Sequence, residues 1–185
     1  MNSFWNARMM EKCSALSIPP TQIYIGVSIH LQELYLLEDG TVRRMFSIST
    51  SKKEPSCIED SLGTPWGLHK ISAKVGDGAP MGMVFRGREP TGKCFHEYDE
   101  KTNQQNLITT RILRLSGLER GLNSGGNFDS WRRYIYIHGT NHEEKIGSPA
   151  SSGCVQLSNV DVMTLFEMVT EGTLVLIEKE PISVI

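Results

Sequence analysis

The chain has 185 residues, of which 39% are hydrophobic and 22% are charged, and its formal net charge is −2. This length predicts a single domain that can bury a substantial core. The near-neutral charge gives no electrostatic case for binding nucleic acid or an anionic membrane surface. No apolar run approaches the roughly 18 residues that a helix needs to span a bilayer, so no transmembrane segment is predicted.

The first twenty residues predict an N-terminal arm that precedes the main domain. The segment ends in Pro19-Pro20, which stops any helix, so we expect either a loose arm or a short helix. Asn6 and Glu11 interrupt its apolar residues, and it therefore lacks the apolar core of a secretory signal. Residues 21–185 are predicted to form the globular domain.

Short runs rich in Val, Ile, Leu and Tyr predict a mostly β domain with one or two short helices. Glu38-Asp39-Gly40 between two such runs is typical of a hairpin turn. Ser158 and Asp161 form a capping pattern that predicts a helix start, and Gly172 is expected just past that helix. The predicted strands cover residues 22–28, 33–37, 41–49, 68–75, 83–86, 107–115, 133–137 and 174–177.

Residues 89–106 form the one long stretch without clear periodicity. Loops of this length are often lids or binding surfaces, so we expect a lid over the functional site. Deleting residues 90–105 should then raise the Michaelis constant while the domain stays folded. Cys94 and His96 within the stretch are two candidate ligands without a matching pair, so we predict no metal site. No organic cofactor is indicated.

The stretch from Tyr134 to Asn159 carries the candidate chemistry. The strand predicted over residues 133–137 ends at His138, and a glycine-rich loop leads on to Cys154. A thiol with an ordinary pKa of about 8.5 is only a few per cent thiolate at neutral pH, and a nearby imidazole can take its proton. The pair predicts a cysteine nucleophile and its base. The alternative is an inert, buried cysteine beside a histidine at a strand end.

Small residues in front of the thiol suggest a second function for the loop. An oxyanion needs backbone N–H groups that it can approach without meeting a side chain. Ser152, Gly153 and Cys154 run through the turn into the candidate nucleophile. We therefore expect their three backbone N–H groups to form an oxyanion hole.

The cysteines do not predict a disulfide scaffold. Four cysteines in a chain of this length are sparse, and they include no Cys-x-x-Cys pair. The sequence leaves open one bridge among Cys13, Cys57 and Cys94. We expect Cys154 to be free in the active form, because a disulfide would remove the nucleophile.

The whole stretch resembles the signature of the L,D-transpeptidase catalytic domain family of bacterial cell-wall enzymes. That signature has a strand ending in His-Gly-Thr, then Ile-Gly, then Ser-His-Gly-Cys, and shortly afterwards Asn and Asp. Upstream, Thr64-Pro65-Trp66-Gly67 resembles a second element of the family, and the resemblance covers about residues 22–177. The matching positions in the signature are His138, Gly139, Thr140, Ile146, Gly147, Ser151, Gly153, Cys154, Val155, Asn159 and Asp161.

The resemblance implies a β-sandwich-like fold and a cysteine acyltransferase. In this reading Cys154 attacks the carbonyl at the L-centre of a diamino acid in a peptidoglycan stem peptide. The terminal D-alanine leaves with a proton from His138, which the backbone carbonyl of Gly139 orients in this family. Thr140 and Gln156 are expected to contact the substrate. An amine of a second stem then accepts the acyl group and gives a 3→3 cross-link, or another amine is attached.

The resemblance also implies an inhibitor and a location. Water in place of the amine would make the protein an L,D-carboxypeptidase. Members of the family are acylated by carbapenems, so the same reaction is expected at Cys154. The family acts outside the cytoplasmic membrane, which implies the cell envelope or periplasm, whereas the lack of a recognisable signal keeps a cytoplasmic location open. The oligomeric state is not indicated.

Two positions depart from the family signature. Ser152 replaces the His before Gly-Cys, and Gln156 replaces an Arg. Both changes remove a cationic group beside the thiol, and losing a bidentate Arg pair typically costs about 1–3 kcal/mol. We therefore also consider a domain that binds stem peptides without turnover and, as a weaker reading, a hydrolase like the cysteine peptidases. Asn159 and Asp161 are expected to start a helix rather than to act in catalysis.

Overall fold

The computed structural model describes residues 2–181, and the strands of this part of the chain form one sheet. The strands are β1 (Ile23–Ser28), β2 (Glu33–Glu38), β3 (Thr41–Ser47), β4 (Gly67–Val75), β5 (Met83–Arg86), β6 (Glu89–Cys94), β7 (Ile108–Gly117), β8 (Tyr136–Thr140), β9 (Val155–Leu157) and β10 (Leu174–Glu178). The α-helices are α1 (Asn2–Leu16), α2 (Glu100–Asn103) and α3 (Asn159–Met168), and the 3-10 helices are η1 (Phe95–Glu97), η2 (Gly126–Phe128) and η3 (Glu143–Lys145).

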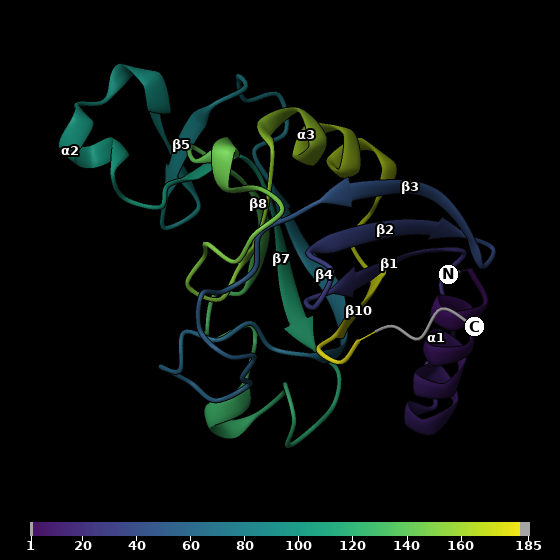
Figure 1. Cartoon of the computed structure of the whole chain (residues 1–185). Helices are drawn as coiled ribbons and strands as arrows, with labels where there is room; N and C mark the ends of the chain where they lie inside the picture. The colour runs from purple at the N-terminus through teal and green to yellow at the C-terminus, as the bar shows by residue number, and fades with distance from the viewer. Residues whose placement is uncertain (1, 182–185) are drawn as a thin grey trace.

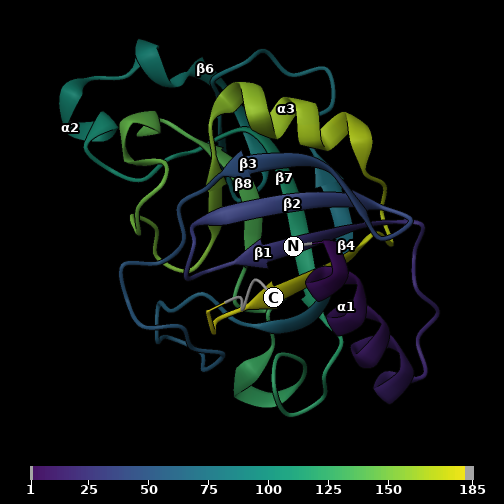
Figure 2. The same cartoon turned by 45° about the vertical axis from the view of Figure 1, so that its right-hand side comes forward.

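The sheet branches at β7. Its main path runs β3-β2-β1-β10-β4-β7-β5-β6, while β8 also pairs with β7 and carries β9 on its other side. The β1–β10 and β8–β9 pairs are parallel, and the remaining pairs are antiparallel. Register shifts in the β2–β3, β4–β7 and β7–β8 pairs help the sheet to bend around a core, as Figures 1 and 2 show. The mostly β, sandwich-like fold is confirmed.

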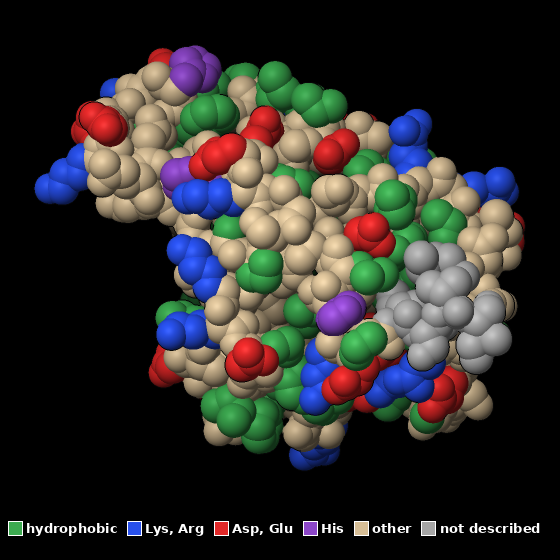
Figure 3. Space-filling view, in the orientation of Figure 1, with side chains coloured by type: hydrophobic (Ala, Val, Ile, Leu, Met, Phe, Trp, Pro, Cys, Tyr) green, Lys and Arg blue, Asp and Glu red, His purple; other side chains and the backbone are tan. Residues whose placement is uncertain are grey.

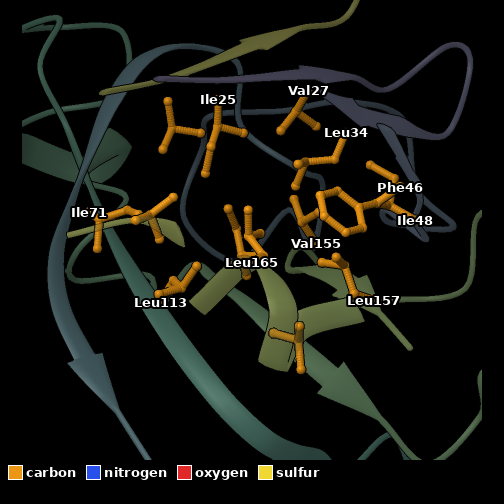
Figure 4. Close-up of a cluster of buried hydrophobic side chains, with 14 of the residues drawn as sticks. Ile25, Val27, Leu34, Phe46, Ile48, Ile71, Leu113, Val155, Leu157 and Leu165 are labelled. Carbon is orange, nitrogen blue, oxygen red and sulfur yellow. The ribbon is translucent and has the colours of Figure 1, made fainter. Parts of the chain in front are cut away.

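The main hydrophobic core lies between the curved sheet and α3. Alternate residues of β1 divide between two cores: Ile25 and Val27 face this one, and Tyr24 faces the other side of the sheet. Figure 4 shows Leu165 of α3 among side chains from several strands, including Ile25 of β1 and Val155 of β9. The core therefore anchors the strand that follows the candidate nucleophile.

Helix α1 covers the outer face of the sheet. Trp5, Met9 and Cys13 recur at four-residue spacing and are all buried there against β1, β2, β4 and β10. Gly26 makes room for the indole, because a Cβ atom at this position would lie 2.5 Å from Trp5 Cδ2. Of the two alternatives that the sequence left open, a loose arm or a short helix, the structure forms a helix, which has 15 residues.

Three local predictions need correction. Residues 89–106 hold β6, η1 and α2 rather than one irregular loop, and α2 projects from the body in Figure 1. Strand β8 begins at Tyr136, because the preceding residues form turns and Tyr134 has a φ of +55°. Helix α3 ends at Met168, so Gly172 lies in a separate turn.

The remaining expectations concern the ends of α3 and the membrane. Ser158 caps α3 as predicted, since its hydroxyl accepts a hydrogen bond from the N–H of Asp161 at 3.1 Å. Within residues 2–181, every helix is too short or too polar to cross a bilayer.

Candidate active site

His138 lies in the middle of β8, with only 3% of its surface exposed. Its Nδ1 is 2.7 Å from the backbone oxygen of Gly139. Because a carbonyl only accepts hydrogen bonds, Nδ1 carries the proton and Nε2 presents a lone pair. Burial lowers the pKa of His138 to about 4, so the ring is neutral at physiological pH. A neutral imidazole with a free Nε2 is the form that can accept a proton.

Gly139 cannot carry a side chain in this fold. A Cβ atom there would lie 2.7 Å from Asn159 Oδ1 and 2.8 Å from the backbone oxygen of Thr109. These distances are shorter than van der Waals contact, and one of the neighbours is backbone. The absence of a side chain thus lets α3 and β7 close around the strand end that orients His138.

Asn159 holds that strand end in place. Its Oδ1 accepts hydrogen bonds from the hydroxyls of Thr109, at 2.6 Å, and Thr110. Its Nδ2 donates to the backbone oxygen of Thr140 at 2.9 Å and to Glu143 Oε1 at 2.7 Å. Sequence reasoning assigned Asn159 only a helix-start role; its match to the family signature was the signal for this further one.

Thr140, which the sequence predicts to contact the substrate, is held inside the fold at the end of β8. Its side chain is fully buried, and its hydroxyl accepts a hydrogen bond from the N–H of His142 at 3.1 Å. Its backbone oxygen is bound by Asn159. The hydroxyl therefore stabilises the loop after β8, and the substrate contact of Thr140 stays a prediction.

Cys154 lies directly before β9 and is half-buried. Its Sγ packs against an apolar cluster that includes Phe85 and Tyr136, and it donates a hydrogen bond to the backbone oxygen of Tyr134 at 3.5 Å. Burial raises the pKa of the thiol to about 11, although the backbone N–H of Tyr136 and the charge of Arg133 act in the opposite direction. All four cysteines are free, so the bridge that the sequence left open is not formed.

Parallel pairing of β8 with β9 brings the imidazole and the thiol to one face of the sheet. Ile137 is opposite Val155, and His138 is opposite Gln156. One step back in the same register, Cys154 is level with Tyr136, two residues before His138. Alternation directs these side chains away from the main core, and strand geometry gives about 8 Å between the two Cα atoms.

The turn before Cys154 is fixed by Ser151. Its hydroxyl donates to the backbone oxygen of Cys154 at 2.6 Å and accepts from the N–H of Gly153 at 3.2 Å. Gly153 has a φ of +125°, a conformation that favours glycine. The N–H of Gly153, one of the three predicted oxyanion donors, is thus engaged by the Ser151 hydroxyl in this structure. Within residues 2–181, the N–H groups of Ser152 and Cys154 have no hydrogen-bond acceptor.

Gln156 is nearly enclosed, with 2% of its surface exposed. Its backbone N–H and carbonyl pair with Ser49 on one side, and the residue is opposite His138 on the other. Its side-chain amide makes no hydrogen bond to residues 2–181. The structure therefore places Gln156 on the same face as His138, with the amide uncommitted.

Arg133 is a cation near the thiol that sequence reasoning did not identify. Its guanidinium donates to the backbone oxygens of Ser56 at 3.0 Å and Gly63 at 2.7 Å, and its charge lowers the pKa of Cys154. Arg133 also lines a cavity of about 200 Å³ together with Ser152. It thus supplies a positive charge in a site whose sequence has lost the two cations of the family signature.

A larger cavity of about 790 Å³ lies beside the apolar cluster that contacts Cys154. Val75, Met83 and Phe85 belong to both, and Arg88 and Arg114 line the cavity as well. The wall also contains Glu89, Pro90 and Gly92, which come from β6. Figure 3 shows a hollow below the projecting α2 region, with Lys and Arg side chains along its edge.

The described residues do not gather metal ligands. No group of three His, Cys, Asp or Glu side chains within residues 2–181 could hold a metal ion. Cys94, one of the two ligands that the sequence offered, has its Sγ 3.6 Å from the backbone oxygen of Met81.

Comparison with known proteins shows which family the chain resembles over most of its length. The family model YkuD, the L,D-transpeptidase catalytic domain, matches residues 22–177. YqjB, an L,D-transpeptidase homologue from Bacillus subtilis (strain 168), is 49% identical over 158 residues, which cover 85% of this chain and 72% of YqjB.

Solved structures show the same fold at low sequence identity. An L,D-transpeptidase from Mycobacterium smegmatis aligns with a TM-score of 0.52 and 18% identity over 85% of this chain and 58% of that chain. LdtMt1 in complex with imipenem aligns with a TM-score of 0.51 and 17% identity over 85% and 59%. This chain thus spans less than two thirds of these two longer chains. The family-model match and the identity to YqjB show that the chain belongs to the L,D-transpeptidase catalytic domain family.

Proposed function

We propose that the protein is an L,D-transpeptidase that acts on peptidoglycan stem peptides through a thioester on Cys154. The observation that carries this proposal is the parallel β8–β9 register in a member of this family. That register puts a neutral imidazole and a free thiol on one face of the sheet, beside a cavity large enough for a peptide.

In the first half-reaction, Nε2 of His138 takes the thiol proton as Sγ forms its bond to the peptide carbonyl carbon. The coupling is required because the pKa of the thiol, about 11, leaves little thiolate at rest. Rotation about the Cα–Cβ bond of Cys154 moves the sulfur from the Tyr134 oxygen toward the ring. The N–H groups of Ser152 and Cys154 then stabilise the oxyanion.

The thioester forms when the bond to D-alanine breaks and His138 returns the proton to the leaving amine. In the second half-reaction a side-chain amine of another stem attacks the thioester and gives up a proton to His138. The bond from the carbonyl carbon to Sγ then breaks, and the Cys154 thiolate that leaves takes the proton back from His138. The product is a 3→3 cross-link, or an attachment to another amine. With water as the acceptor, the same groups would give an L,D-carboxypeptidase. The family reading puts this chemistry in the cell envelope.

A domain that binds stem peptides without turnover is the second candidate function. The raised thiol pKa and the hydrogen bond from Sγ to Tyr134 favour it, because both describe a resting thiol rather than an activated one. The two functions make different predictions for acylation, since a binding domain needs no reactive sulfur.

Acylation by imipenem tests the proposal by intact-protein mass spectrometry. Wild-type protein should gain one adduct, Cys154→Ser none, and the matched control Cys94→Ser one, because Cys94 is also half-buried and free. No adduct on the wild type, with stem peptides still bound, would favour the binding domain. An adduct that persists in Cys154→Ser would place the nucleophile elsewhere. Products from tetrapeptide stems then separate transfer, which gives dimers, from hydrolysis, which gives tripeptides.

We further propose that residues 89–106 serve as a lid over the bound peptide. Asn141 ties this segment to the loop after β8, since its Nδ2 donates to the backbone oxygens of Asn103 at 2.8 Å and Gln105 at 3.1 Å. Deleting residues 90–105 would remove β6 from its pairing with β5, so a point change is the better test. Asn141→Ala should raise the Michaelis constant, and unchanged kinetics would argue against a lid.

A further inference from the structure

Two arginines beside the larger cavity have no acidic partner. Arg88 and Arg114 both line it, and neither forms an ion pair with any Asp or Glu within residues 2–181. Asp77 and Glu89 also line the cavity, and the charge of Glu89 acts on Arg88, but neither carboxylate forms an ion pair with the two arginines in the described part of the chain. The two like charges repel each other, so an anion placed between them would be stabilised. The fold must therefore hold them by other contacts.

Aromatic rings fix the guanidinium of Arg114. It lies 3.3 Å from the centroid of the Trp131 ring and 5.2 Å from that of Tyr134, and its Nη2 donates to the backbone oxygen of Trp131 at 2.9 Å. The residue is 8% exposed, and its buried Nε–H has no acceptor among residues 2–181. A buried donor without a partner is costly, and a ligand oxygen would remove that cost.

Arg88 reaches the same place from the tip of the β5–β6 hairpin. Its guanidinium lies 5.4 Å from the centroid of the Tyr134 ring, and its Nη1 donates to the hydroxyl of Tyr136 at 3.2 Å. Arg88 has a φ of +75°, within a two-residue turn that directs the side chain. The tyrosines that contact Arg88 are the residues whose backbone contacts the Cys154 sulfur.

The sheet register places this pair close to the thiol. Arg114 of β7 is opposite Tyr136 of β8, and Tyr136 is level with Cys154. The three residues therefore form a row across adjacent strands, with about 10 Å between the Cα atoms of Arg114 and Cys154. A separation of about 10 Å is the length of about three extended residues, so an anion held by the guanidinium groups is within reach of a peptide whose carbonyl is attacked by the sulfur.

We propose that Arg88 and Arg114 form a carboxylate-binding subsite for the peptide that Cys154 attacks. The ligand is a carboxylate within one residue of the scissile amide, and this identification rests on the proposed transpeptidase function. Two sources supply that chemistry: the C-terminal carboxylate of the leaving residue, and the side-chain carboxylate of the diamino acid. Planar guanidinium groups bind either through paired N–H donors.

Alkylation of Cys154 tests the subsite without requiring turnover. Iodoacetate and iodoacetamide react with the same sulfur, but only iodoacetate is an anion. The rate of iodoacetate divided by the rate of iodoacetamide at Cys154 therefore reports the anion site. Peptide mass mapping separates Cys154 from the half-buried Cys94, which serves as the internal reference. Arg88→Gln and Arg114→Gln should each lower the ratio about three- to tenfold at Cys154 and leave it unchanged at Cys94.

Matched variants separate charge from folding. Arg86→Gln, an exposed arginine of the same hairpin, should keep the wild-type ratio. Arg114→Lys keeps the charge and should recover part of the ratio, and thermal melting checks that each variant is folded. Ratios that stay at the wild-type value in both Arg88→Gln and Arg114→Gln would overturn the subsite, whether or not the protein is an enzyme.

Synthetic stem peptides identify which carboxylate is bound. If the leaving residue supplies it, a C-terminal amide should raise the Michaelis constant of the wild type about tenfold, and Arg88→Gln should add little for that peptide. If the diamino acid supplies it, amidation of its side-chain carboxylate should act in this way instead. Absence of turnover for every peptide would reject the proposed function but leave the alkylation result intact.

Discussion

The histidine side and the cysteine side of the site differ in how firmly the fold holds them. His138 is enclosed within β8, and its orientation depends on Gly139 and on the hydrogen bonds of Asn159. Cys154 lies in a turn at the start of a three-residue strand, and its sulfur makes one long hydrogen bond to a backbone oxygen. In the proposed mechanism, the base would thus be positioned before substrate arrives, whereas the thiol would have to be turned and deprotonated during the reaction.

Removing the fixed base should have the largest effect on activity. His138→Ala is expected to lower kcat for stem-peptide transfer about 10²–10⁴-fold, because no other group takes the thiol proton. His142→Ala, a matched change in the loop after β8, should stay close to wild type. Steady-state kinetics would contradict the assignment if both variants lost activity equally.

The buried histidine should also make stability depend on pH. Burial lowers the pKa of His138 to about 4, whereas an unfolded histidine has a pKa of about 6.5. Between these values the unfolded chain binds more protons, so the free energy of unfolding falls as pH drops from about 6.5 to about 4. The expected loss is about 3 kcal/mol for this histidine, and buried His69, with its pKa also lowered to about 4, contributes in the same direction.

Urea unfolding at several pH values checks this slope. His138→Gln should reduce it by about 1.4 kcal/mol per pH unit between the two pKa values. The exposed His30→Gln serves as the control and should keep the wild-type slope. Equal slopes in His138→Gln and wild type would mean that the imidazole is not held neutral by the fold.

Loosening the histidine side should cost stability and activity together. Asn159→Ala leaves the hydroxyls of Thr109 and Thr110 and the backbone oxygen of Thr140 without their partner, which should cost about 2–3 kcal/mol. Asn106→Ala removes a single hydrogen bond to Ala150 and should cost less than about 1 kcal/mol. Chemical denaturation gives the free energy of unfolding of both variants. Similar losses in Asn159→Ala and Asn106→Ala would contradict a central role for Asn159.

The smallest expected effect concerns the cysteine side. Arg133→Gln removes the cation that lowers the pKa of Cys154, so alkylation of the thiol by neutral iodoacetamide should slow by up to about fivefold. As pH increases, the alkylation rate of Cys154 should begin to rise at a higher pH in Arg133→Gln than in the wild type. Arg132 lines the same 200 Å³ cavity, and Arg132→Gln is the control. A pH–rate profile identical in Arg133→Gln and wild type would show that this charge does not act on the sulfur.

Sequence patterns predicted the parts of the fold that depend on apolar alternation. Strands such as β1, β4 and β10 expose one face to each core, and their residues show it. Strand β6 was missed because its residues, Glu89–Cys94, are mostly polar and show no apolar alternation, although they pair with β5 across the turn at Gly87 and Arg88. The four-residue spacing of Trp5, Met9 and Cys13 is the pattern of a helix with one buried face. It was overlooked because polar residues such as Asn6 and Glu11 lie between them.

The site was predictable where chemistry and local spacing coincide, and less so where the sheet creates the contact. His138 and Cys154 could be named as candidates from their residue types and from the family signature, and the β8–β9 register puts them on one face of the sheet. The approach of Arg133, Arg88 and Arg114 could not, because it depends on register between strands far apart in the sequence. The burial of the Thr140 hydroxyl could not be predicted either, because a signature does not tell a buried hydroxyl from one that faces a ligand.

The position of α1 affects how the domain can be shortened. The family-model match begins at residue 22, after this helix has ended. Cutting the chain there would uncover the apolar side chains of Tyr35, Leu37 and Leu176, which α1 shields from water. An exposed patch of this kind favours self-association. A shortened chain that begins at residue 22 should therefore aggregate, whereas one that keeps the first helix should not.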